Sequence, residues 1–457
     1  MTRPLYLHIG LQKTGTSYLQ GLFLGNVDAL RGAGLDVYPT QRRAAYWLML
    51  DVRDRFRPHD PAQAREVLRD LPGNLDAAQG RAALVSEESF SPAEDAQIQR
   101  LLAACSDREV HVVVTARDLG RQIPSVWQQG LQSGRAMTFP DYLARLHQTQ
   151  GTPAPIWWQK DLPAVLEKWA RHVPAERIHV VTVPPPGADK GLLLERFCSV
   201  LGIDAGLLDQ SSVGRANRGL RLEQAEVLRR VNAGIPDDLK RRDVYGDVGK
   251  RGFSVKVLGG AEGRPILLPE SERAWCEELS HRYVEHVRAG GYDVVGDVED
   301  LLPRDSAFAP DEQEVTEEQV AQVAVDALTT MVSRQLATHR RRKDRAAAEA
   351  AERAGRGWRG RLRRMLRVCG RRPTPSADQR HHDLVGHTRR QVVARAHDAV
   401  VGDPARVGAH DVHAQLTAVH QVVDAAARLR RGMGQAGAPS RRGPGVGRDA
   451  AQGGDRR

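Results

Sequence analysis

A group of residues suited to anion binding lies near the start of the chain. The group consists of Gly10, Lys13, Thr14, Gly15, Thr16 and Ser17. An apolar run precedes it and an amphipathic run follows it, a pattern that predicts a buried strand, a tight loop and the start of a helix. Such a loop directs main-chain N–H groups, the positive end of a helix dipole and two hydroxyls to one place, which suits a phosphate. Lys13 adds a full positive charge there.

Two later apolar runs also end in residues that can do chemistry. The run from Ala82 to Val85 leads into Glu87, and the run from Val110 to Ala116 ends in Arg117. A carboxylate at such a position can act as a general base. Arg gives paired, charge-assisted hydrogen bonds to a phosphate, and Ser125, on the following helical stretch, can reach the same group.

The elements that position these residues are strands separated by helices. Apolar, β-branched runs alternate with amphipathic stretches of helical length, which predicts βαβ units and a central parallel sheet. Ligands in such sheets bind beyond the carboxyl ends of the strands. The sequence therefore predicts an α/β, P-loop-like three-layer fold with Lys13, Glu87 and Arg117 on one rim of the sheet.

The loop differs from the nearest named motif, the Walker A loop G-x-x-x-x-G-K-[ST]. Gly10, Gly15 and Ser17 have its spacing, but Thr16 follows the second Gly, and Lys13 precedes it. The order K-T-G-T-S after a strand resembles instead the 5′-phosphosulfate loop of the sulfotransferases, which bind 3′-phosphoadenosine 5′-phosphosulfate (PAPS). Gln12 replaces the Pro that is usual in that loop. Arg117 and Ser125 have the spacing of the Arg and Ser that hold the 3′-phosphate in this family, and the resemblance extends over about residues 3 to 303.

The resemblance implies a division of roles. The PAPS-binding residues would be Lys13, Thr14, Gly15, Thr16, Ser17, Arg117 and Ser125, with PAPS as co-substrate and no metal. Lys13 would also act in catalysis, and Glu87 would be the base that accepts a proton from the acceptor. Ser86 to Phe90 resembles a strand end of heparan-sulfate-type sulfotransferases, where a Lys usually follows the Glu; here Glu88 follows. Glu88 stays an alternative base, and His8 is expected to be a buried neighbour rather than the base.

Length and composition divide the chain. Its 457 residues, 41% of them hydrophobic, exceed one ordinary domain. We predict a sulfotransferase-like domain at 1–305, a helical basic extension at 306–372 and a low-complexity, disordered tail at 373–457. The four Cys residues have no paired or C-x-x-C spacing, so neither a disulfide framework nor a zinc site is indicated. There is no signal-peptide pattern and no long apolar span, which predicts a cytoplasmic protein.

The net charge of +10 is concentrated in one segment. Residues 339–372 contain fourteen Lys and Arg against three Asp and Glu, an excess of eleven. The globular part is therefore not basic overall, and no nucleic-acid partner is expected. Residues 356–369 form a basic amphipathic segment, which predicts peripheral contact with the inner face of a membrane; a solvated charged helix is the alternative.

These patterns together predict a sulfotransferase that moves a sulfuryl group from PAPS to a hydroxyl or amine. A carbohydrate or glycolipid acceptor is expected from the resemblance of the strand end that carries Glu87 and from the lack of a pattern for a steroid-like apolar pocket. Phenols, peptides and small metabolites stay open as acceptors. A P-loop nucleotide kinase is the alternative among enzymes. A non-catalytic protein that uses the basic tail to bind nucleic acid or membrane is the alternative from another class. The oligomeric state is left open.

Overall fold

A computed structural model describes residues 2–58, 60–105, 107–158, 160–212, 219–309 and 313–369. At residue 212 and over 354–369 only the backbone is described. The predicted tail at 373–457 lies outside the described residues, as do the side chains of the predicted membrane-contact segment. The chain divides into two compact units, Met1–Glu349 and Ala350–Arg457, and the account below concerns the first. The domain boundaries predicted from sequence stay predictions.

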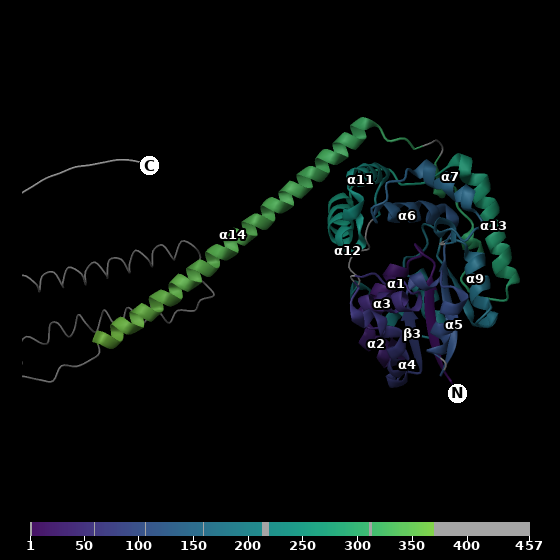
Figure 1. The fold of residues 1–457 in the computed structure, drawn as a ribbon, viewed down its shortest axis with the longest axis horizontal. Coiled ribbons are helices and arrows are strands. Elements are labelled where there is room, and N and C mark those ends of the chain that lie inside the picture. Colours follow the sequence, from purple (N-terminus) through teal and green to yellow (C-terminus); the bar gives the residue numbers. More distant parts are fainter. Residues whose placement is uncertain are drawn as a thin grey trace, which may run out of the picture. The chain divides into compact units, whose positions relative to one another are not determined.

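A parallel sheet of six strands forms the centre of this unit, in the order β2-β3-β1-β4-β5-β7. The strands are β1 (Arg3–Gly10), β2 (Leu35–Val37), β3 (Ala82–Ser86), β4 (Arg108–Ala116), β5 (Ile178–Thr182) and β7 (Asp293–Val295). Helices lie against both faces of the sheet (Figure 1). The predicted three-layer α/β class, with a strand, loop and helix of P-loop type at its start, is confirmed.

The helices of the first layer are α3 (Arg42–Val52), α4 (Val67–Ala77), α5 (Asp95–Ala103), α6 (Leu119–Leu131), α9 (Leu162–Ala170) and α13 (Arg273–Ala289). They share a core with alternate residues of the strands, such as Leu5, Leu7 and Ile9 of β1. The other layer contains α1 (Thr16–Gly25), α2 (Val27–Gly32) and α10 (Leu192–Leu201), which pack on Leu84 and Val113 from the opposite face. The period of two along the strands thus supplies both cores.

Further helices lie outside these layers. They are α7 (Phe139–Thr149), α8 (Pro155–Trp158), α11 (Leu222–Gly234), α12 (Arg242–Tyr245), a π-helix at Gly246–Leu258 and α14 (Glu317–Cys369). A small second sheet pairs β6 (Leu268–Pro269) with β8 (Phe308–Ala309). None of the helices in the described part of the chain is both long and apolar enough to cross a membrane.

The sequence predicts one helix from Thr16 to Arg31, and this prediction is wrong because the structure breaks it at Asn26. The Asn26 side chain donates to the carbonyl of Leu22 at 2.9 Å and to that of Asp209 at 3.1 Å. Its carbonyl oxygen also accepts from the N–H of Asp209 at 2.8 Å. A contact with a distant loop thus holds a polar side chain at the break, which local periodicity does not reveal.

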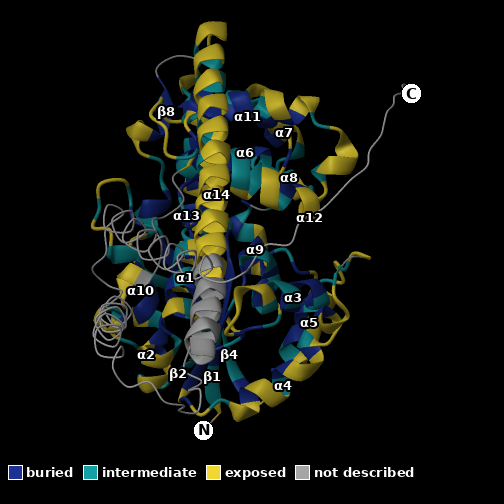
Figure 2. Cartoon of the chain, turned by 90° about the vertical axis from the view of Figure 1, so that its left-hand side faces the viewer, coloured by how far each residue is buried: buried dark blue, intermediate teal, exposed yellow. Residues whose placement is uncertain are grey.

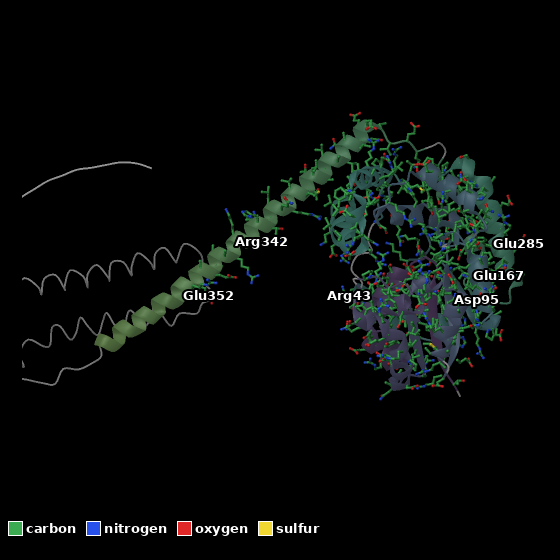
Figure 3. All side chains as sticks on the ribbon, viewed as in Figure 1. Arg43, Asp95, Glu167, Glu285, Arg342 and Glu352 are labelled. Atoms are coloured by element: carbon green, nitrogen blue, oxygen red, sulfur yellow. The ribbon has the colours of Figure 1, made fainter. Side chains whose placement is uncertain are left out.

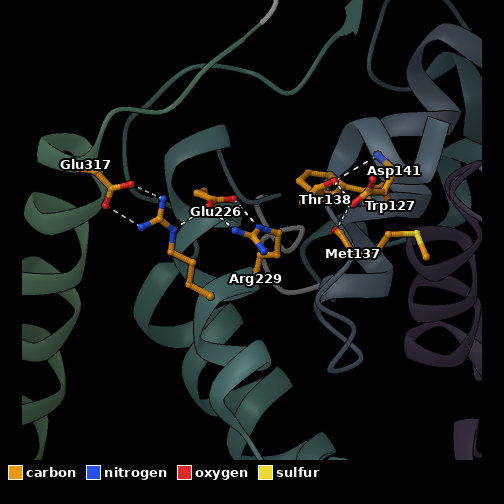
Figure 4. A network of polar contacts seen from close by, with 8 residues as sticks. Trp127, Met137, Thr138, Asp141, Glu226, Arg229 and Glu317 are labelled. Atoms are coloured by element: carbon orange, nitrogen blue, oxygen red, sulfur yellow. Dashed lines mark hydrogen bonds and ion pairs between the residues drawn. The ribbon is translucent and has the colours of Figure 1, made fainter. Parts of the chain in front are cut away.

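The first turn of α14 is tied to α11 by ion pairs. Arg230 lies 2.8 Å from Glu317 of α14 and 2.7 Å from Glu226 of its own helix, and Arg229 also contacts Glu226 at 2.7 Å (Figure 4). Val320 and Val323 pack against the main core, and Ala327 is buried in it. The beginning of α14 therefore belongs to the folded unit.

Candidate anion-binding site

The loop between β1 and α1 has the backbone that its glycines predict. Gly10 has a φ of 105° and Gly15 a φ of 91°, both in the region that favours glycine. A Cβ at Gly10 would lie 3.0 Å from the carbonyl oxygen of Glu88, and one at Gly15 would lie 2.6 Å from Leu193. Gly10 is therefore favoured by both space and conformation, since its neighbour is main chain, whereas Gly15 is favoured by conformation, since the Leu193 methyl group can move. Lys13 has a φ of 65°, which few residues other than Gly adopt and which is typical of ligand-binding loops.

The loop presents unpaired amides. Within the described residues, the main-chain N–H groups of Gln12, Lys13, Thr14 and Gly15 donate no hydrogen bond to another group. The carbonyl groups of two of these residues are engaged, since Gln122 donates to that of Gln12 at 2.9 Å and Arg117 to that of Lys13 at 3.2 Å. The main-chain carbonyl groups thus hold the loop in place, while its main-chain N–H groups stay available to a ligand. Successive free N–H groups before a helix form an anion-binding concavity.

Arg117, at the carboxyl end of β4, lies against this loop. Its Nη1 donates to the Lys13 carbonyl, but its buried Nε has no partner. Among the residues that the structure describes, no carboxylate forms an ion pair with Arg117, because Asp118 is engaged by Arg121. Burial lowers the pKa of Arg117 to about 10, and Arg121 adds to this effect. A half-buried Arg whose buried N–H has no partner, and which has no acid partner among the described residues, is unusual without an anionic ligand.

Lys13 lies among other charges. Burial lowers the pKa of Lys13, the nearby carboxylate of Glu88 opposes that shift, and Lys250 and Arg117 lower the pKa further. Lys250 comes from the π-helix at Gly246–Leu258, and its pKa is likewise lowered by burial. Three cations from distant parts of the chain therefore lie near one another beside the loop, and the carboxylate of Glu88 lies near Lys13 as well.

A buried polar network lies beneath the loop. Thr14 is fully buried, and its hydroxyl lies 2.5 Å from the carbonyl of Leu11 and 2.6 Å from the hydroxyl of Thr115. His8 lies 3.3 Å from the same Thr115 hydroxyl and 2.7 Å from that of Ser86. Burial lowers the pKa of His8 to about 3, so its ring is neutral at pH 7. His8 is thus a buried neighbour, as expected, and links three strands to the loop.

We expect Thr14→Val to lower the free energy of unfolding by about 1–3 kcal/mol, because the buried oxygen of Leu11 loses its donor. Urea denaturation checks this value. Ser17→Ala is the matched control, since it removes an exposed hydroxyl from the same loop and is expected to change stability by less than about 0.5 kcal/mol. Equal effects of the two substitutions would contradict a supporting role for Thr14.

The hydroxyls predicted to bind PAPS differ in their surroundings. The Thr14 hydroxyl points into the network beneath the loop, so only the N–H of this residue is available to a ligand. The Thr16 hydroxyl donates to Glu88, while that of Ser17 accepts from Arg42 at 3.1 Å. The Ser125 hydroxyl donates to the carbonyl of Arg121 in its own helix at 2.8 Å, which leaves its lone pairs free to accept.

Glu87 lies beside the loop rather than in it. It lines a shallow pocket that is open to solvent and has Tyr38, Arg42 and Phe23 among its walls. Burial raises the pKa of Glu87, a hydrogen bond from Ser89 opposes the shift, and Glu88 adds to it. The structure thus brings Lys13, Arg117 and Glu88 together at the loop, and it places Glu87 in the adjoining pocket.

Sequence reasoning left two cations of this region out of the site. Arg42 follows β2, and the carboxyl end of β2 lies at the same rim of the sheet as the other site residues. Its position in the sequence after a strand could therefore have identified it as a site residue. Lys250 lies in a K-R-G segment that resembles a late basic loop of sulfotransferases, a pattern too common to identify it. Lys250 lies near Lys13 because the π-helix at Gly246–Leu258, far away in the sequence, packs close to the loop.

The described residues contain no group of three or more His, Cys, Asp or Glu side chains that could hold a metal ion. The carboxylates nearest the loop are Glu87 and Glu88, and they point to different neighbours. Glu88 accepts from Thr16, whereas Glu87 accepts from the N–H of Ser89 at 3.1 Å. The donors at the loop thus outnumber the acids, which favours an anionic ligand.

Comparison with known proteins adds little to this geometry. No family model matches the sequence, and no curated protein matches it. Among solved structures, a sulfotransferase from Alicyclobacillus acidocaldarius is similar over 53% of this chain and 100% of its own, with 16% sequence identity and a TM-score of 0.32. At that identity and TM-score the likeness carries no argument about function.

Proposed function

We propose that this chain is a sulfotransferase that moves the sulfuryl group of PAPS to a hydroxyl or amine of an acceptor. The observation that carries the proposal is Arg117, a half-buried side chain whose buried Nε has no partner and which has no ion-paired carboxylate among the described residues. It lies against a loop whose N–H groups are unpaired. A donor with phosphates at both its 5′ and 3′ positions would satisfy both sets of donors.

The residues divide between the two phosphates. Lys13 and the loop N–H groups, with Thr16 and Ser17, would bind the 5′-phosphosulfate, while Arg117 and Ser125 would bind the 3′-phosphate. Sulfuryl transfer, like phosphoryl transfer, depends on positioning and on stabilising charge on the leaving group. Lys13 would supply that charge at the bridging oxygen. PAPS contributes the activated sulfuryl group, and no residue of the site requires a metal for this assignment.

The pocket beside the loop supports a place for the acceptor. Glu87 has a raised pKa there, which suits a general base, and Arg42 reaches from the pocket wall to Ser17 of the loop. A carbohydrate or glycolipid hydroxyl is the acceptor that we propose. Arg42 would favour an acceptor with an anionic group near the reacting hydroxyl, because no carboxylate pairs with Arg42 among the described residues. We propose a cytoplasmic location, with any membrane contact made through 356–369.

Calorimetric titration with 3′-phosphoadenosine 5′-phosphate tests the donor site. We expect metal-independent binding that Arg117→Gln weakens by about two orders of magnitude, because charge-assisted hydrogen bonds to the 3′-phosphate are lost. Adenosine 5′-phosphate is the matched ligand, since it lacks that phosphate and its affinity should change little in the variant. Equal weakening of both ligands would assign Arg117 to another role, and no binding by the unchanged protein would end the proposal.

A P-loop nucleotide kinase is the second candidate, and one contact favours it. The Thr16 hydroxyl donates to Glu88, so an acid stands beside a loop hydroxyl, as in sites that hold a magnesium-bound nucleotide. Lys13 lies before Gly15 rather than after it, which opposes this assignment. Competition between ATP and 3′-phosphoadenosine 5′-phosphate, with and without magnesium, separates the two candidates. Tighter binding of magnesium-ATP would establish the kinase.

A non-catalytic role for the basic extension remains a prediction from sequence. The charged residues that would serve it lie largely at positions whose side chains are outside the described residues. Removing the chain after Glu349, where the first unit ends, separates the two roles. Donor binding should persist in the shortened protein, and binding of anionic vesicles or nucleic acid should disappear if the extension carries it.

A further inference from the structure

Helix α14 carries an exposed row of large apolar side chains. The exposed fractions are 57% for Val325, 61% for Leu328, 38% for Met331, 53% for Val332 and 64% for Leu336. The helix is mostly exposed over its described length (Figure 2). Four of these residues, Val325, Leu328, Val332 and Leu336, follow one another at spacings of three and four, so they form one stripe. We call these four residues the outer stripe.

The outer stripe is not the face that packs on the folded unit. Val320 and Val323 contact the core, and Ala327 is buried in it. At about 100° per residue, the outer stripe lies roughly 150° around the helix from that packed face. The helix thus has two apolar faces, and the folded unit covers one of them. Large apolar side chains gathered on one exposed helix face mark an interaction surface.

Charges at the two ends of the outer stripe are of opposite sign. Glu318 lies before it, and Arg340, Arg342 and Lys343 lie after it, all exposed. Glu317 is already engaged by Arg230, whereas Glu318 has no ion pair among the described residues. Arg342 projects from α14 into solvent (Figure 3). A helix with an acidic start, an apolar middle and a basic end is complementary to a second copy of itself in the opposite direction.

We propose that α14 pairs in antiparallel orientation with α14 of a second copy of this chain. A crossing centred near Thr330 sets Leu328 of one copy against Val332 of the other, and Glu318 against Arg342. It brings the acidic start of each helix to the basic end of its partner. Parallel pairing instead juxtaposes Arg340, Arg342 and Lys343 of the two copies, which repel one another. The observations therefore favour a second, antiparallel copy as the occupant of the outer stripe.

Sedimentation velocity of the full chain over a range of concentrations tests the pairing. We expect a reversible monomer–dimer equilibrium at micromolar concentration. Leu328→Glu combined with Val332→Glu should weaken the dimer at least about a hundredfold, since four apolar side chains are lost from each interface. Ser333→Glu is the matched control, because it adds an exposed carboxylate to α14 outside the outer stripe and should leave the dimer unchanged. A monomer at all concentrations up to about 100 µM would overturn the proposal.

A charge exchange tests the antiparallel direction. Glu318→Lys should weaken the dimer about tenfold at low salt, because it faces Arg342 of the partner, and adding Arg342→Glu should restore it. A dimer that the single change leaves intact, or that the double change does not restore, contradicts the antiparallel pairing. Sedimentation with vesicles of anionic phospholipid addresses another occupant. If the protein is a monomer that binds these vesicles, and Leu328→Glu combined with Val332→Glu abolishes the binding, then the outer stripe binds membrane instead of a second copy.

Discussion

Lys13→Met is expected to lower kcat/KM for sulfuryl transfer by about 10² to 10³-fold, the largest loss that we expect from a change in the donor loop. Lys13 is the residue of the loop with a full positive charge, and Arg117 binds its main-chain carbonyl rather than its side chain. Within the described residues the Lys13 ammonium has no hydrogen bond or ion pair to hold it, so it can turn toward the oxygen on which charge develops. Transfer assays with PAPS, together with calorimetry of 3′-phosphoadenosine 5′-phosphate, measure the effect on kcat and on binding separately.

Two further variants show whether the loss in Lys13→Met comes from the charge itself and from its position in the loop. Lys13→Arg keeps the charge and should retain more activity than Lys13→Met, although the guanidinium is larger and places its charge differently. Lys250→Met removes a cation that lies near Lys13 but comes from another element, and it should reduce donor affinity more than kcat. If Lys13→Met changes only the affinity and leaves kcat intact, Lys13 binds the donor without assisting departure of the leaving group, and its predicted catalytic role is wrong.

The sequence predicts the part of the site that depends on strand ends. A parallel sheet gathers the carboxyl ends of its strands on one rim, so the order of apolar runs was enough to place Lys13 and Arg117 together. The structure shows that Arg117 contacts the Lys13 carbonyl at 3.2 Å. Local rules also gave the bend of the loop, since Gly10 and Gly15 both adopt positive φ. These features follow from short-range pattern and sheet topology.

Features that depend on distant contacts could not be predicted. The strand β7 has three residues, Asp293–Val295, and exists through its pairing with β5, so no period is long enough to reveal it. The contact of Glu88 with Thr16 depends on the direction in which the chain leaves β3. The proximity of Lys250 to Lys13 requires a helical segment more than two hundred positions away in the sequence to return to the loop. Side-chain direction and long-range return are not encoded in local periodicity.

Glu87→Gln is expected to lower kcat by about 10² to 10⁴-fold while the affinity for 3′-phosphoadenosine 5′-phosphate stays nearly unchanged. The amide keeps the shape of the side chain but cannot accept a proton from the acceptor. Glu87 lines the pocket beside the loop, and in the described part of the chain it forms no hydrogen bond or ion pair with Lys13 or Arg117, so donor binding should be spared. Single-turnover transfer, compared with calorimetry of the donor product, separates the two effects.

If Glu87 is the base, activity should depend on pH in a definite direction. Burial disfavours the charged carboxylate and therefore raises the pKa of Glu87 above that of an exposed Glu. A base acts only when it is deprotonated, so activity should fall as the pH decreases through this raised pKa, and the variant should lack that step. Glu88→Gln is the matched control, because it removes the neighbouring carboxylate, which contacts Thr16. Loss of kcat in Glu88→Gln with activity retained in Glu87→Gln would transfer the proposed role of base from Glu87, which lines the pocket beside the loop, to Glu88.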